Sequence, residues 1–275
     1  MRLPAPLLRL AARQRQQRSA EMTRTVVALA SLLPTSQPLS LLPRIGRALV
    51  VAPHPDDETL GCGGTVARLA AAGTEVSLVL VSDGGATLGA AHPRAATARA
   101  RRAETQRASR HLGIRTLLPL ALPDGAVGDH LDLLGERLAE VADRFDPELL
   151  LLPWPLDGHP DHGAVAAALA RRPLRSSPEL WGYEVHTPIL RPDRVVDVST
   201  VIDRVEAALA EHVTAAAALD LTAVRGLARY RSLASAGGVG YAEAFVTLRW
   251  SDLPAWVTAA AQVPVGARAA RTRSR

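Results

Sequence analysis

The chain has 275 residues, 48% of them hydrophobic, and is therefore long enough to bury a substantial core as one α/β domain. Its one cysteine, Cys62, excludes a disulfide-stabilised fold and favours a reducing, cytoplasmic location. The net charge of +5 comes from arginine without lysine, and no basic motif interleaved with aromatic residues accompanies it, so we expect no nucleic-acid partner.

Residues 1–44 form a basic N-terminal extension. Residues 25–33 are apolar, but the charged region before them is too long for a signal peptide, and no small-x-small cleavage site follows before Pro34. No stretch approaches the roughly 18 uninterrupted apolar residues that a membrane span needs. We expect a surface helix in this extension, which leaves peripheral association with a membrane open.

Apolar strands alternate with helices from residue 45 onward. The predicted strands lie at residues 49–52, 75–81, 116–121, 148–152, 180–185, 195–198 and 245–250. The predicted helices lie at residues 64–73, before Gly113, at 131–145, beyond Pro160 and, as a pair, between 199 and 234. This alternation predicts βαβ crossovers, and so an α/β fold with a mostly parallel sheet covered by helices on both faces. We place the domain at residues 45–252 and a basic C-terminal tail, flexible at its end, at residues 253–275.

Two polar motifs follow the first and fourth of these strands: Pro53-His54-Pro55-Asp56-Asp57-Glu58 and Gly158-His159-Pro160-Asp161-His162. The carboxyl ends of parallel strands share one edge of the sheet, where ligands bind in open α/β folds. A catalytic zinc takes three ligands from His, Asp or Glu and leaves one position for water, and neither motif supplies such a set alone. The two motifs together predict a divided metal site at this edge, and metal-assisted hydrolysis.

The two motifs resemble the LmbE-like, PIG-L family of zinc-dependent de-N-acetylases. The resemblance covers residues 45–250 and includes Arg101-Arg102-Ala103-Glu104 and Tyr241-Ala242-Glu243-Ala244-Phe245. It implies a Rossmann-like fold and the removal of an acetyl group from N-acetylglucosamine carried on a lipid, inositol or other aglycone. The implied partner is a small N-acetylated glycoside or glycolipid.

The resemblance implies that His54, Asp57 and His162 hold the metal and that Asp56 is the general base. The spacing supports this division independently, because adjacent carboxylates in a strand-to-helix turn point in different directions. One can then bind the metal while its neighbour faces the water that attacks the acetamide. Two histidines and one carboxylate suit zinc, but they also admit iron, manganese or cobalt.

The resemblance also implies that protonated His159 holds the oxyanion, with Asp161 orienting the ring and keeping it charged. Glu58 is interpreted as a supporting carboxylate or a helix N-terminal charge. Arg101 is favoured as a contact to substrate hydroxyls or phosphate. Asp124, like Asp83, either binds sugar hydroxyls or makes a turn with the glycine that follows.

Several positions are left without a role by the sequence. Some family members have a tyrosine where this chain has Asp157, and the His-x-Ser-Gln of others reads His212-Val213-Thr214-Ala215 here. The remaining histidines, His186 among them, are unassigned. The aromatic residues near the motifs suit packing and sugar stacking equally well: Trp154, Trp181 and Tyr183.

Three other functions are considered. The first is hydrolysis of a non-sugar or conjugate amide within the same family. The second is a nucleotide-binding oxidoreductase or transferase, since Gly61-x-Gly63-Gly64 follows a strand, but the full dinucleotide fingerprint is missing and the acidic residues before it would repel a pyrophosphate. The third is a carbohydrate-binding module without catalysis, which would not need Asp56 beside the ligand set.

Overall fold

The structure, a computed structural model, describes residues 42–89, 91–217, 222–235 and 238–262. Within them, seven strands form one sheet in the order β3-β2-β1-β4-β5-β7-β6. The strands are β1 (Arg47–Ala52), β2 (Glu75–Ser82), β3 (Thr116–Leu122), β4 (Leu149–Pro153), β5 (Glu179–Tyr183), β6 (Arg194–Asp197) and β7 (Ala242–Leu248). Strands β1 to β5 pair in parallel, whereas β7 is antiparallel to both β5 and β6. The predicted mostly parallel α/β sheet is confirmed.

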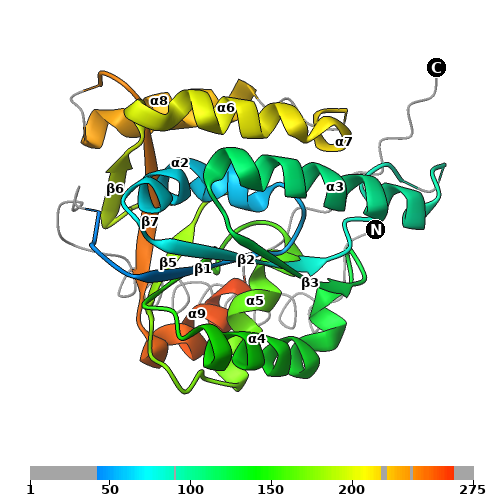
Figure 1. Ribbon diagram of the computed structural model, residues 1–275. Helices are drawn as coiled ribbons and strands as arrows, with labels where there is room; N and C mark the ends of the chain where they lie inside the picture. Colours follow the sequence, from blue (N-terminus) through cyan, green and yellow to red (C-terminus); the bar gives the residue numbers. More distant parts are fainter. Residues whose placement is uncertain (1–41, 90, 218–221, 236–237, 263–275) are drawn as a thin grey trace, which may run out of the picture.

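Helices cover both faces of this sheet (Figure 1). On one face lie α2 (Asp57–Ala71), α3 (Arg94–Leu112), α6 (Ile202–Glu211), α7 (Val213–Ala216) and α8 (Thr222–Arg231). On the other face lie α4 (Leu131–Phe145), α5 (Pro160–Arg171) and α9 (Leu253–Ala260). None of the helices in the described ranges is long and apolar enough to cross a bilayer.

The sheet is apolar on both faces because helices cover each of them. Every residue of β4 is buried, which explains its unbroken leucine run. The aromatic residues that suited packing or stacking are packing residues, since Trp154, Trp181 and Tyr183 are at most 3% exposed. Helix α9 lies within the predicted tail, yet its Trp256 joins the core between the sheet and α5. The folded part therefore extends past residue 252, while the N-terminal extension up to residue 41 lies outside the described residues.

Helix α2 begins seven residues earlier than predicted and runs through Gly61, Gly63 and Gly64. These glycines allow close packing. A Cβ atom on Gly61 would lie 2.2 Å from Cδ2 of Tyr183, and one on Gly64 would lie 2.6 Å from Cβ of Val198. The helix is broken at Cys62, whose φ of −149° is not helical. The early start places Asp57 on the first turn of the helix, directly after β1.

The edge of the sheet that holds both motifs is a topological switch point. Strand β1 pairs with β2 on one side and with β4 on the other. The connections after β1 and β4 lead into α2 and α5, which cover opposite faces (Figure 1). This separation opens a crevice beyond the carboxyl ends of the two strands, where ligands bind in such folds.

Candidate functional site

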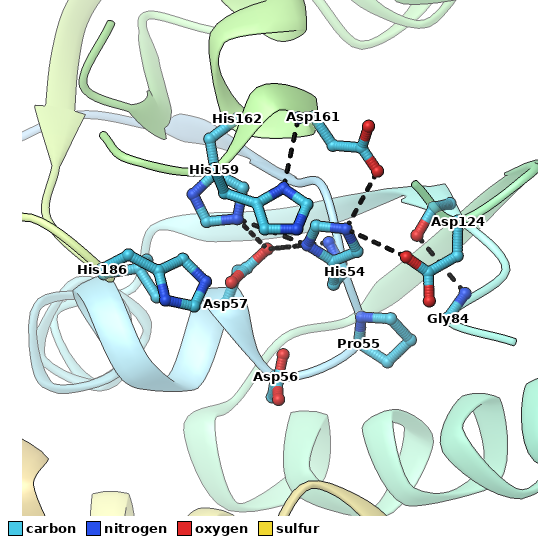
Figure 2. Close-up of polar contacts among 12 residues, drawn as sticks. His54, Pro55, Asp56, Asp57, Gly84, Asp124, His159, Asp161, His162 and His186 are labelled. Carbon is cyan, nitrogen blue, oxygen red and sulfur yellow. Dashed lines mark hydrogen bonds and ion pairs between the residues drawn. The ribbon is translucent and has the colours of Figure 1, made fainter. Parts of the chain in front are cut away.

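Three side chains from the two motifs meet at this crevice in a nearly equilateral triangle of ligand atoms (Figure 2). His54 Nδ1 lies 3.2 Å from Oδ2 of Asp57 and 3.3 Å from Nε2 of His162. The third edge, from His162 Nε2 to Asp57 Oδ2, is 3.1 Å. All three residues are buried. The structure thus brings together the residues that the sequence predicted as metal ligands.

The outer nitrogen of each histidine faces another carboxylate. His54 Nε2 lies 3.1 Å from Oδ2 of Asp161, and His162 Nδ1 lies 3.0 Å from Oδ1 of Asp157. Histidines that bind metals usually donate their second ring N–H in this way, which fixes the tautomer and the ring orientation. The other ring nitrogens, His54 Nδ1 and His162 Nε2, are thereby left to face each other and Asp57.

The triangle fits a divalent metal ion. Ligand bonds to zinc are about 2.0–2.2 Å long, so the ligand atoms of a tetrahedral site are separated by about 3.4 Å. The side chains His54, His159 and His162 also offer ligand atoms within 4.8 Å of one another, as do His54, Asp124 and Asp161. Although burial disfavours its cation, the carboxylates of Asp57 and Asp157 raise the pKa of His162 to about 9. The charge that holds this proton would equally attract a metal cation.

Asp56 comes directly before Asp57 in the chain, and its side chain points away from the triangle toward Arg101. Its φ of 132° is rare for a residue other than glycine, and such strained backbone is concentrated at functional sites. Its Oδ2 lies 2.9 Å from Nη2 of Arg101, which also donates to the Pro55 carbonyl. Burial raises the pKa of Asp56 to about 6, and the Arg101 charge opposes that rise. A buried carboxylate with such a pKa is suited to accept a proton near neutral pH.

The contacts of the His159 ring differ from those that the sequence predicted. Its Nδ1 accepts the backbone N–H of Asp161 at 3.2 Å, which places the ring proton on Nε2. The Asp161 carboxylate contacts His54 instead and accepts the N–H of Gly125 at 2.8 Å. Burial, together with the charges of the other histidines, lowers the pKa of His159 to about 4. The predicted contact between the Asp161 carboxylate and the His159 ring is not formed, since the start of α5 directs this carboxylate toward the first motif. The catalytic roles of both residues stay predictions.

A cavity of about 310 Å³ opens beside the triangle, and the two predicted substrate contacts, Arg101 and Asp124, line it. Arg101 is 4% exposed and also donates to Thr87 Oγ1. Asp124 Oδ2 accepts the N–H of Ala86 at 2.9 Å, while its Oδ1 lies 3.4 Å from His54 Nε2. Asp83 makes a turn, because its Oδ1 accepts the N–H of Gly85 at 2.8 Å.

Two histidines that the sequence left unassigned lie at the site. His186 lines the cavity and stacks on His159, with a ring separation of 5.5 Å. His212 is buried behind Asp56, with its Nε2 3.1 Å from Thr59 Oγ1 and 3.4 Å from Glu58 Oε1. The other carboxylate oxygen of Glu58 accepts the N–H of Asp56 at 3.2 Å, in line with its predicted supporting role. The position of the family's His-x-Ser-Gln pattern is the sequence signal for His212, whereas no pattern in the sequence marks His186.

The chain is similar to known deacetylases. The family described as PIG-L, GlcNAc-PI de-N-acetylase, matches residues 49–172, which include both motifs. A probable N-acetyl-α-D-glucosaminyl L-malate deacetylase 2 from Bacillus cereus is 28% identical over 178 residues, spanning 60% of this chain and 81% of that protein. A diacetylchitobiose deacetylase from Thermococcus kodakarensis is 28% identical over 178 residues, spanning 58% and 66% respectively. The crystal structure of a conserved protein from Thermus thermophilus has 32% identity and a TM-score of 0.62, over 74% of this chain and 94% of that one.

Proposed function

Because the chain belongs to the PIG-L family of de-N-acetylases, we propose that it is a metal-dependent amide hydrolase that removes the acetyl group of an N-acetylglucosamine-type substrate. The observation that carries this proposal is the triangle of His54, Asp57 and His162, with the carboxylate of Asp56, which lies outside the triangle and pairs with Arg101, next to it in sequence. A metal-binding set alone would suit a binding protein, whereas an adjacent strained carboxylate suits catalysis.

We assign the triangle as the metal ligands and zinc as the ion, with iron, manganese or cobalt as the alternatives. A divalent ion bound there supplies a Lewis acid and an acidified water molecule. Asp57 brings the negative charge of the set, and it accepts the backbone N–H of His54 at 2.8 Å, which holds the carboxylate in place. Asp157 and Asp161 orient the two imidazoles from outside.

Asp56 acts as the general base and His159 as the oxyanion donor. Asp56 lines the cavity and takes the proton of the attacking water, a role that requires its ionised form. His159 donates from Nε2 to the oxygen of the tetrahedral intermediate, since its Nδ1 already accepts the N–H of Asp161. Neutral His159 provides this hydrogen bond without first acquiring a proton.

Arg101, Thr87 and Asp124 form the side of the cavity that we assign to the sugar hydroxyls. Contacts connect them, because Arg101 donates to Thr87 and the adjacent Ala86 donates to Asp124. A guanidinium, a hydroxyl and a carboxylate together offer donors and acceptors, as sugar hydroxyls require. We retain a cytoplasmic location as part of the proposal, along with peripheral membrane association through the N-terminal extension.

Acetate release tests the proposal. Protein stripped of metal with a chelator should be inactive, and zinc should restore acetate release from N-acetylglucosaminyl L-malate or N,N′-diacetylchitobiose. Parallel reconstitution with iron, manganese and cobalt identifies the preferred ion. If the protein hydrolyses an N-acetylated non-sugar amide but no N-acetylglucosaminide, the alternative function, hydrolysis of a non-sugar or conjugate amide, replaces the deacetylation of a sugar. Full metal content with no hydrolysis of either kind would favour a binding module.

A further inference from the structure

The cavity has two unlike sides. Asp124 and His186 lie on opposite sides of the His54, Asp57 and His162 triangle (Figure 2). The Asp124 side also carries Thr87 and Arg101, whose groups are linked by the contacts described above. The His186 side arises from the segment after β5, which contributes no residue to either motif.

His186 is held on its side by a buried carboxylate. Oδ2 of Asp157 accepts the backbone N–H groups of Val185, His186 and Thr187 at 3.1, 2.8 and 3.2 Å. The hydroxyl of Thr187 in turn accepts the N–H of Gly158 at 2.9 Å. The ring of His186 lies 5.2 Å from that of His162. These contacts fix the backbone from which His186 reaches the cavity, which reduces the ordering cost of binding.

Leu60 lines the same cavity. Its neighbour Gly61 packs so closely on the end of β5 that a Cβ atom would lie 3.0 Å from the carbonyl oxygen of Glu184. His186 follows Glu184 by two residues. The side of the cavity opposite Asp124 therefore combines an imidazole with an aliphatic side chain.

The order of substituents around a pyranose ring indicates which part of the substrate would face the Asp124 side of the cavity and which part would face the His186 side. In N-acetylglucosamine the acetamide is on C2, with C1 and its aglycone on one side and C3 and its hydroxyl on the other. Under the proposed function, the acetamide lies at the triangle and the ring hydroxyls face Arg101, Thr87 and Asp124. The bond from C1 to the aglycone then leaves toward His186.

We propose, on the basis of the proposed deacetylase function, that His186 and Leu60 form the aglycone subsite and that this subsite selects a neutral, hydroxyl-bearing aglycone over an anionic one. Among the described residues that line the cavity, Arg101 is the one arginine or lysine, and it pairs with Asp56 on the opposite side. Behind His186 is the Asp157 carboxylate, and the nearby Glu184 is paired with Arg231 at 2.6 Å. An anionic aglycone would find no unpaired guanidinium or ammonium group among the described residues that line the cavity.

The experiment compares kcat/KM for N,N′-diacetylchitobiose, with a neutral aglycone, and for N-acetylglucosaminyl L-malate, with an anionic one. The zinc-loaded wild-type enzyme should prefer diacetylchitobiose. His186→Arg should shift the ratio toward the malate substrate by about tenfold, the effect of roughly 1.4 kcal/mol. His186→Ala should lower kcat/KM for diacetylchitobiose more than for the malate substrate, and it provides the test if the larger side chain prevents folding. Thr87→Val on the other side is the matched control and should lower both values equally.

The outcomes separate the two proposals. Acetate release from neither substrate by wild-type enzyme overturns the deacetylase function and this inference with it. Wild-type activity with a preference for the malate substrate, or ratios unchanged in both His186 variants, overturns the subsite alone. Zinc content measured by elemental analysis should stay stoichiometric in His186→Ala. Loss of zinc would make His186 a metal ligand and also overturn the subsite.

Discussion

The turns after β1 and β4 carry the same kinds of side chain but are stabilised in different ways. After β4, His159 has extended backbone angles, its ring accepts the N–H of Asp161, and Pro160 opens α5. Residues adjacent in sequence therefore form this helix start by themselves. After β1, Asp56 has a φ of 132°, and the guanidinium that pairs with its carboxylate comes from α3. The start of α5 is therefore encoded locally, whereas the carboxylate of Asp56 depends on a guanidinium from a distant helix. Contacts with residues 125 and 187 then add to the local ones by holding Asp161 and Gly158.

Further distant contacts support the first turn. His212, between α6 and α7, lies against Glu58, and Glu243 of β7 contacts α2 beyond the break at Cys62. Oε1 and Oε2 of Glu243 accept the N–H groups of Gly64 and Thr65 at 2.6 and 2.7 Å. The difference between the turns indicates that the two adjacent carboxylates need tertiary contacts to point in different directions, whereas the start of α5 alone sets the spacing of His159 and His162.

The largest expected effect separates the two carboxylates of the first turn. Asp56→Asn should retain zinc but lose roughly two to four orders of magnitude in turnover, because an amide cannot take the proton of the attacking water. Asn also tolerates positive φ better than most residues. Asp57→Asn should lose zinc as well, since it removes the negative charge of the ligand set. Steady-state kinetics with elemental analysis measure both, and equal zinc loss in the two variants would mean that the assignments are wrong.

Removing a ligand from the second turn should abolish metal binding without unfolding the domain. His162→Ala should reduce bound zinc well below one ion per chain, while the circular dichroism spectrum stays that of the wild type. The reason is that the core on both faces of the sheet, not this site, provides most of the stability of a domain this large. His130→Ala, outside the motifs, serves as the control. Full zinc occupancy in the His162 variant would exclude this residue from the ligand set.

Arg101 tests whether the first turn depends on a distant partner. Arg101→Gln should reduce turnover by about 100-fold, because the base is no longer held in position. The Arg101 charge lowers the pKa of Asp56 against the effect of burial, so its loss should raise that pKa above about 6. The base must be ionised to act, and activity is lost as pH falls through its pKa. The acidic limb of the kcat/KM profile should therefore move to higher pH.

Arg107→Gln, on the same helix, removes a partly exposed ion pair with Glu211 and is the matched control. It should leave the profile unchanged. An acidic limb that does not move in Arg101→Gln would show that Arg101 does not set the ionisation of the base.

The same contrast explains what could be predicted from the sequence. The meeting of the two motifs was predictable because their places after strands bring them to one edge of a parallel sheet. The choice of His54, Asp57 and His162 within the motifs came from the family resemblance. Helix α4 was predicted at its observed bounds. The contact of Asp161 with His54 and that of Asp157 with residues 185–187 were not predictable, because they depend on which loops the strand order places side by side. The early start of α2 was missed because its glycines lie within the helix, where Gly61 packs against Tyr183 of β5 and Gly64 packs against Val198.

The smallest effect concerns Glu243, the most remote support of the first turn. At pH 5, Glu243→Gln should lower the free energy of unfolding by about 1–2 kcal/mol, because an amide presents one acceptor oxygen to two buried N–H groups. Burial raises the pKa of Glu243 from 4.5 to about 7, so the folded wild type binds a proton more tightly than the unfolded chain. Wild-type stability from this group should therefore fall as pH rises from 4.5 to 7, and glutamine removes that dependence. Denaturant unfolding at pH 5 and pH 8 measures the free energy of unfolding of wild type and of Glu243→Gln. The difference between these two free energies should be smaller at pH 8 than at pH 5. A difference that widens instead would mean that Glu243 is ionised in the fold throughout this range and that its charge stabilises the second half of α2.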